Sequence, residues 1–226
     1  FLRKGEKTIK TSIYKYFYYN LKNNKRHMFS DWLNNINIIL KKNIFITGSS
    51  GLLGSYLKNY LKKKKIKFKI FKRNKYKNYN KIYFCKFFKR NNYTHIINLA
   101  AYTDVDACEK NKSVSKRINV SFLKKICDGI KMSNLKIKLI HFYTDQMYYN
   151  LNQNNEKNFK IRNYYTACKI MSEKISLSVD SIILRTNFFG KSLVKKRISF
   201  TDWIYNSIKN KKKIYLADDI FFSPIW

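Results

Sequence analysis

A short apolar run followed at once by evenly spaced glycines constrains this chain more than any other feature. Ile44, Phe45 and Ile46 form the kind of run that a buried parallel strand needs. Beyond the glycines, apolar residues recur at spacings of three and four, as on one face of a helix: Leu53, Tyr56, Leu57, Tyr60 and Leu61. The stretch 43–61 therefore predicts a strand, a tight turn and a helix that packs back on the strand.

The three glycines of this turn favour a phosphate-binding role. Gly48, Gly51 and Gly54 fall in the turn and the first helical turn, where side chains would block the turn, a pyrophosphate or helix–sheet contact. The free N–H groups at a helix N-terminus attract an anion. Plain turn chemistry gives the same spacing, so the cofactor interpretation depends on the rest of the chain.

Composition limits the classes of protein that remain. The 226 residues are 45% hydrophobic and 17% aromatic, which excludes a disordered chain. The net charge of +35 is spread over every segment and comes mostly from Lys, so we expect no specific nucleic-acid site. No apolar run is long enough for a membrane span, and the isolated cysteines indicate no metal site and a cytoplasmic protein.

The order of apolar segments predicts an α/β fold. Residues 1–42 are expected to be an N-terminal extension or the tail of a preceding domain, with a helix over 32–40 capped by Ser30. Further strands are predicted at 66–71, 82–85, 94–101 and 139–143, and a long helix at 113–132. Repeated alternation of strand and helix implies a doubly wound parallel sheet of Rossmann type over 43–226.

Two strand ends indicate which cofactor such a sheet would bind. The second strand ends in Lys72 and Arg73, and no acidic residue stands there to bind an unphosphorylated ribose. Two cations suit a 2'-phosphate, which favours NADPH and leaves NADH as the alternative. The small residues Ala100 and Ala101 would let the cofactor lie close to the backbone.

A tyrosine and a lysine four residues apart supply the candidate chemistry. Tyr165 and Lys169 share one face of a predicted helix that follows the strand ending in Thr144 and Asp145. A nearby ammonium favours the phenolate and lowers the pKa of a tyrosine, which makes the phenol a usable proton donor near neutral pH.

These motifs together resemble the extended short-chain dehydrogenase/reductase superfamily, and within it the dTDP-4-dehydrorhamnose reductase family of sugar-nucleotide reductases. The resemblance covers residue 43 to the end of the chain. It rests on the glycine motif at 46–54, the segments 97–109, 184–190 and 218–224, and the residues Thr144, Asp145, Tyr165, Lys169 and Glu173.

The resemblance implies NADPH-dependent reduction of the 4-keto group of a nucleotide-linked deoxysugar, in nucleotide-sugar and cell-surface polysaccharide biosynthesis. Tyr165 would protonate the carbonyl oxygen, Thr144 would hydrogen-bond it, and Lys169 would hold the nicotinamide ribose. The expected cofactor-binding residues are Gly48, Ser50, Gly51, Leu52, Leu53, Gly54, Arg73, Ala100, Ala101, Tyr102 and Lys169. The expected substrate-binding residues are Thr103, Val105, Asp145, Arg185 and Asn187.

Several positions depart from the family pattern. Residues 146–150 replace the usual Tyr-Val-Phe-Asp-Gly, Tyr143 replaces a serine, and the loop after Gly190 is unusually basic. The sequence stops soon after Pro224, so we expect a fragment with a truncated small substrate-binding lobe. A sugar-nucleotide epimerase or dehydratase, a non-catalytic NAD(P)-binding regulatory homologue and assembly as a homodimer remain open. A structural ion pair of Arg185 is the alternative to its expected contact with the substrate, because buried or half-buried arginines are often structural.

Overall fold

The computed structural model describes residues 43–72, 79–144, 160–188, 190–194, 197–215 and 224–225. The helix predicted at 32–40, the candidate residues Arg73 and Asp145, and the altered segment 146–150 lie outside the described residues.

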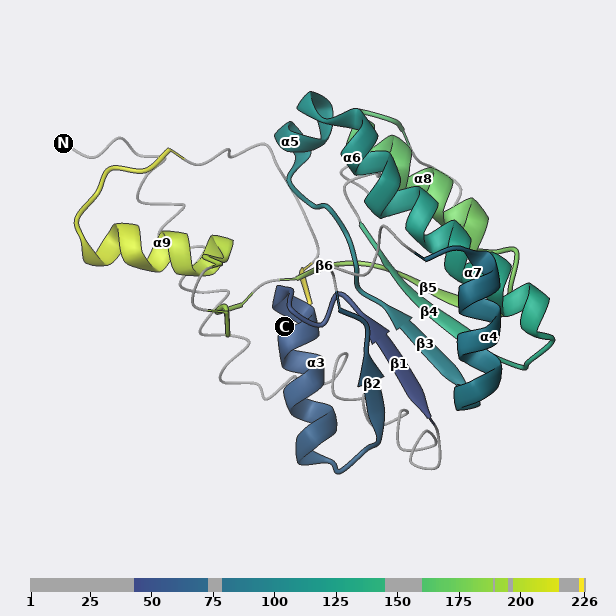
Figure 1. Ribbon diagram of the computed structural model, residues 1–226. Helices are drawn as coiled ribbons and strands as arrows, with labels where there is room; N and C mark the ends of the chain where they lie inside the picture. The colour runs from purple at the N-terminus through teal and green to yellow at the C-terminus, as the bar shows by residue number, and fades with distance from the viewer. Residues whose placement is uncertain are drawn as a thin grey trace. The chain divides into compact units, whose positions relative to one another are not determined.

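Five strands form one parallel sheet in the order β2-β1-β3-β4-β5 (Figure 1). Their bounds are β1 (Ile44–Thr47), β2 (Phe68–Ile70), β3 (His95–Asn98), β4 (Lys138–Tyr143) and β5 (Ser181–Arg185). Strands β1 and β3 are buried throughout, which explains their continuous apolar runs. The predicted α/β fold with a parallel sheet is confirmed.

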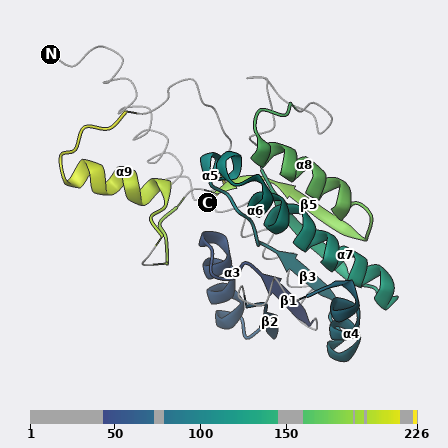
Figure 2. The same ribbon diagram turned by 45° about the horizontal axis from the view of Figure 1, so that its top comes forward.

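Helices cover both faces of this sheet. Helix α3 (Leu52–Lys63) lies on one face, whereas α4 (Lys81–Asn91), α7 (Phe122–Ser133) and α8 (Tyr164–Ser176) lie side by side on the other (Figures 1 and 2). Because the chain crosses from one face to the other after β2, neighbouring strands β1 and β3 lead to opposite sides. A doubly wound sheet places its ligand crevice at such a reversal, beside the carboxyl ends of the strands.

The prediction of a strand at 82–85 is wrong, because this segment is the first half of α4. The Asn80 side chain accepts a hydrogen bond from the Tyr83 N–H at 2.9 Å and caps the helix. Phe84 and Phe88, one turn apart, are both fully buried. The aromatic residues resemble a strand over four positions and show their helical spacing only over eight.

The long helix predicted at 113–132 is present in three consecutive parts. Helix α6 (Lys112–Lys116) leads into a π-helical turn, η3 (Arg117–Ser121), which continues as α7. Such turns occur often at functional sites. This one brings Asn119 to the carboxyl end of β3, as described below.

The core between the sheet and α4 is rich in aromatic residues. Phe45 lies at its centre and makes edge contacts with the rings of Phe71 and Phe87, at centroid distances of 5.7 and 5.2 Å. Gly129 lets α7 approach α4 closely, since a Cβ atom there would lie 2.5 Å from the Cβ of Phe84. This packing fixes β1, and therefore the glycine turn that follows it.

Beyond β5 the described chain forms a short parallel pair, β6 (Asn187–Phe188) with β7 (Pro224–Ile225), and helix α9 (Phe200–Lys209). Ser199 and Asp202 cap α9 reciprocally. None of the helices within the described ranges is long and apolar enough to cross a lipid bilayer.

Candidate active site

The glycine turn is shaped by contacts that exclude side chains. Gly48 has φ +70°, and a Cβ atom on it would lie 2.3 Å from the carbonyl carbon of Leu99. A Cβ atom on Gly54 would lie 2.3 Å from the carbonyl oxygen of Gly48. The first glycine therefore permits the turn against β3, and the third permits contact between helix and turn.

The middle glycine differs from the other two. Gly51 caps α3 with φ −79°, and the nearest atom to a Cβ there is the Gly48 carbonyl oxygen at 3.3 Å. No side chain caps the helix, and its first turn carries no acidic residue. The N-terminal amides of α3 and the absence of a side chain at Gly51 suit a pyrophosphate, because backbone N–H groups and the helix dipole at a helix N-terminus attract anions. Ser50 lies in this turn, and Leu52 and Leu53 begin α3.

The segment that follows β3 packs against the glycine turn, since Leu99 and Ala100 lie directly beside Gly48. Ala100 is buried, and Ala101 and Tyr102 are half-buried. Asn119 holds this segment by accepting a hydrogen bond from the Tyr102 N–H at 2.8 Å and donating one to the Tyr102 carbonyl at 3.0 Å. Asn119 is thus a structural partner of the site that sequence analysis missed, because it lies inside a helix with no local motif.

Lys169 joins helix α8 to the carboxyl end of β4. Its ammonium donates a hydrogen bond to the Phe142 carbonyl oxygen at 3.0 Å and lies 5.9 Å from the centre of the Tyr165 ring. The side chain is buried, and this burial lowers the pKa of Lys169 to about 8. An amine with such a pKa can exchange its proton near physiological pH.

The two other catalytic candidates lie at the same end of the sheet. Thr144 directly follows β4 and is buried. Tyr165 is buried in the first turn of α8, where the Asn163 side chain accepts a hydrogen bond from the Thr166 N–H at 2.8 Å. A well-capped helix start fixes the direction of the Tyr165 side chain.

A buried polar row crosses the sheet beneath the glycine turn. Thr47, Asn98 and His141 are register partners on β1, β3 and β4 and are linked by hydrogen bonds. The row continues from His141 to the Ser172 hydroxyl on α8, at 3.2 Å. Burial lowers the pKa of His141 to about 3, so the imidazole is neutral.

Donors and acceptors in this polar row follow one direction. A neutral His141 that accepts from the Asn98 amide at Nδ1 donates to Ser172 from Nε2, and Ser172 donates to the Lys169 carbonyl at 2.7 Å. Every member is buried, so each needs its partner to offset desolvation. The row therefore fixes α8 to three strands just below the site.

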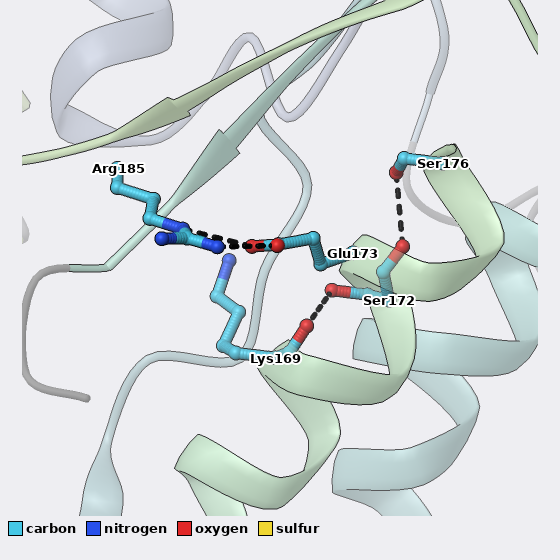
Figure 3. Close-up of polar contacts among 5 residues, drawn as sticks. All are labelled: Lys169, Ser172, Glu173, Ser176 and Arg185. Atoms are coloured by element: carbon cyan, nitrogen blue, oxygen red, sulfur yellow. Dashed lines mark hydrogen bonds and ion pairs between the residues drawn. The ribbon is translucent and has the colours of Figure 1, made fainter. Parts of the chain in front are cut away.

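Arg185, a predicted substrate ligand, is engaged within the protein by Glu173 of α8 (Figure 3). Its Nε and a terminal nitrogen donate to the two carboxylate oxygens at 3.0 and 2.5 Å, and both side chains are about 85% buried, being 14% and 15% exposed. Glu173 lies one turn beyond Lys169, so this bidentate pair ties the same helix to the end of β5.

The remaining predicted site residues lie along the carboxyl ends of the strands. Thr103 is exposed, and Val105 begins helix α5 (Val105–Lys110), which the Asp104 side chain caps through the Ala107 N–H at 2.9 Å. Asn187 begins β6, two residues after β5. The structure thus gathers the glycine turn, the Ala100–Tyr102 segment and the Tyr165–Lys169 pair at one edge of the sheet.

The sheet, its crossover and its glycine turn define a protein with a Rossmann-type nucleotide-binding fold. The chain belongs to the family described as the RmlD substrate binding domain, whose model matches residues 42–226. Among curated proteins, none matches the sequence.

Three solved structures illustrate the similarity in fold. A dTDP-4-dehydrorhamnose reductase from Clostridium acetobutylicum is 22% identical with a TM-score of 0.64, over 74% of this chain and 60% of that one. The same enzyme from Bacillus anthracis, in complex with NADP, is 22% identical with a TM-score of 0.64, over 75% and 60%. The Bordetella bronchiseptica enzyme WbmG, in complex with NAD, is 19% identical with a TM-score of 0.62, over 77% and 61%. This chain therefore spans about three fifths of the length of these proteins.

Proposed function

We propose that this chain is the cofactor-binding part of an NADPH-dependent reductase, which reduces the 4-keto group of a nucleotide-linked deoxysugar in nucleotide-sugar and cell-surface polysaccharide biosynthesis. The observation that carries the proposal is the position of Lys169, buried beside Tyr165 and hydrogen-bonded to the end of β4. A buried amine is costly to the fold, and the adjacent phenol gives it a chemical use.

The proposed roles of the protein groups follow from their positions. The Tyr165 hydroxyl delivers a proton to the carbonyl oxygen of the sugar, and Thr144 hydrogen-bonds that oxygen. The Lys169 ammonium favours the phenolate of Tyr165 and holds the nicotinamide ribose. Bound NADPH supplies the hydride. Gly51 and the amides of α3 hold the pyrophosphate, and Ala100, Ala101 and Tyr102 border its path.

The preference for NADPH rests on charge at the end of β2. Lys72 follows this strand and is exposed, and Arg73 comes next in the sequence. Two cations favour the 2'-phosphate of NADPH. The Bacillus anthracis protein holds NADP and the Bordetella enzyme holds NAD, so the family fold accommodates either form.

Substrate binding is assigned to the carboxyl ends of β3, β4 and β5. Thr103, Val105, Asp145 and Asn187 remain the proposed contacts to the sugar nucleotide. Arg185, whose Nε and one terminal nitrogen donate to Glu173, stays among the proposed substrate contacts. The proposal includes a cytoplasmic location, in keeping with four free cysteines of which three are buried, and leaves a homodimer as the assembly to be tested.

Hydride transfer from labelled cofactor tests this function on the full-length protein. With NADPH that carries deuterium at C4 of the nicotinamide, the reductase should deliver deuterium to C4 of a dTDP-4-keto-6-deoxysugar, measured by mass spectrometry. Tyr165→Phe should bind NADPH normally and transfer deuterium at least about 100-fold more slowly.

Three other results would indicate a function other than reduction. Interconversion of the sugar without consumption of NADPH would indicate an epimerase, and loss of water from the sugar would indicate a dehydratase. Cofactor binding without any conversion of dTDP- or UDP-linked keto sugars would indicate a non-catalytic regulatory protein.

A further inference from the structure

We propose that Arg197, in the basic loop between β6 and α9, is a ligand of the cofactor pyrophosphate at the glycine turn. The inference rests on the proposed function, since it concerns the same NAD(P) site. It adds a side-chain cation, from a segment about 140 residues further along the chain, to a site otherwise built from backbone groups.

The guanidinium of Arg197 lies beside the middle glycine of the turn. One terminal nitrogen of Arg197 is 3.7 Å from the position that a Cβ atom on Gly51 would occupy. Among the described residues, apart from Gly51 and its chain neighbours, the Gly48 carbonyl oxygen alone lies nearer, at 3.3 Å. A pyrophosphate approaches the turn on the side where Gly51 carries no side chain. Arg197 therefore stands where it can donate to phosphate oxygens held at Gly51.

Two sets of hydrogen bonds define the loop that carries Arg197. The Asp202 carboxylate accepts hydrogen bonds from the Ser192 N–H at 2.9 Å and from the Ser199 N–H at 3.0 Å, which joins the two ends of the loop. The Arg197 N–H donates to the Val194 carbonyl at 2.9 Å, which joins the two described parts of the loop. These bonds lower the pKa of Asp202, so the loop is held by a carboxylate throughout the neutral range.

The same loop is bound to the helix that begins at the glycine turn. The Tyr56 hydroxyl, on the second turn of α3, donates to the Lys191 carbonyl oxygen at 2.8 Å. This bond and the approach of Arg197 to Gly51 are two separate contacts between the loop and α3. Lys191 and Arg197, in the two described parts of the loop, therefore contact α3 and the glycine turn before it.

The charge of the turn explains why a cation is useful there. Residues 47–55 contain no Lys, Arg or His, and α3 has its basic residues in the last turn, at Lys62 and Lys63. A pyrophosphate carries two negative charges, whereas a helix N-terminus offers about half of one positive charge. Arg is suited to phosphate because its planar donors can pair with two oxygens at once. Arg197 is the arginine that the structure places at this site.

Binding of two cofactors by one variant tests the assignment. NADPH and NADH share the pyrophosphate and differ in the 2'-phosphate. For Arg197→Gln, titrated by the fluorescence of each reduced nicotinamide, we expect the Kd of both cofactors to rise by the same factor, about tenfold or more. Arg197→Lys should recover part of the loss. Arg90→Gln, which removes an exposed arginine from the last turn of α4, is the matched control and should leave both Kd values unchanged.

The outcomes separate this inference from the proposed function. If the wild type binds cofactor and Arg197→Gln binds both forms equally well, the inference is wrong and the function stands. A loss for NADPH alone would assign Arg197 to the 2'-phosphate, and a loss for dTDP alone would assign it to the substrate; either result overturns the pyrophosphate assignment. Failure of the wild type to bind either cofactor would overturn the proposed function together with the inference.

Discussion

Lys169 donates a hydrogen bond from its buried ammonium to the carbonyl oxygen of Phe142 at 3.0 Å. The bond fixes helix α8 against β4, two residues before Thr144. It also places Tyr165, which lies one turn earlier on α8, at the same end of the sheet. Burial of an amine destabilises the protein unless the amine is well paired. Burial of the Lys169 ammonium at this site should therefore lower the free energy of unfolding.

This cost should be visible in the pH dependence of stability. The pKa of Lys169 is about 8 in the folded protein against 10.5 ordinarily, so between these values the unfolded chain binds more protons. The free energy of unfolding should therefore rise with pH from about 8 to 10.5, by at most about 1.4 kcal/mol per pH unit. Urea unfolding of the wild type and of Lys169→Met, which lacks the charge, measures the difference. Parallel curves over this range would contradict the burial of a charged amine.

His141 should make the folded protein less stable as the pH falls. Its pKa is about 3 in the fold against 6.5 ordinarily, because burial disfavours the imidazolium. As pH falls below 6.5, the unfolded chain takes up a proton that the folded chain refuses, and stability is lost progressively toward pH 3. His141→Gln, which can still accept from Asn98 and donate to Ser172, should lose less stability over the same range. Equal losses in thermal melts between pH 7 and 4 would assign the acid sensitivity to other groups.

Two glycines of the turn, Gly51 and Gly54, should differ in how much stability the protein loses when each is replaced by alanine. Gly54→Ala places a Cβ atom 2.3 Å from a backbone oxygen and should lower the free energy of unfolding by about 3 kcal/mol. Gly51→Ala meets its nearest atom at 3.3 Å with φ −79°, so we expect a change within about 1 kcal/mol. Chemical denaturation of both variants measures this contrast, and a larger loss at Gly51 than at Gly54 would contradict the geometry of the turn.

Arg185 and Glu173 should be coupled energetically. In a double-mutant cycle with Arg185→Gln and Glu173→Gln, we expect a coupling energy of about 1.5–3 kcal/mol, as for hydrogen bonds between charged and largely buried groups. The single variants should both be destabilised. A raised KM for the sugar nucleotide with an unchanged unfolding free energy in Arg185→Gln would instead show that Arg185 serves the substrate.

The positions of strands β1 to β4 and the glycine turn could be predicted because their signals are local. A buried parallel strand gives a continuous apolar run, and the turn at Gly48 and Gly54 excludes side chains through short-range contacts. The prediction from local sequence was wrong at 82–85, where four apolar residues fit a strand as well as they fit the helix α4 that they form. The cap at Asn80 and the helical spacing of Phe84 and Phe88 distinguish the two, but only over a longer window.

Contacts between distant segments were not predictable from spacing. Asn119 holds Tyr102 from inside a helix, and the polar row through Asn98 and His141 depends on the register of three strands. The approach of Arg197 to Gly51 joins a basic loop to a turn far earlier in the chain. A single sequence shows each residue type without showing which residue it meets.

The most direct test of the glycine turn as the cofactor site compares NADPH binding by the wild type and by Gly51→Glu. The fluorescence of the reduced nicotinamide measures the binding. Gly51 has a backbone conformation that any residue can adopt, so the glutamate variant should fold, as circular dichroism can verify. Its carboxylate and bulk would occupy the pyrophosphate path at the start of α3. We expect saturable binding by the wild type and at least about 100-fold weaker binding by the folded variant. Equal binding by the two proteins would contradict the assignment of the glycine turn as the cofactor site.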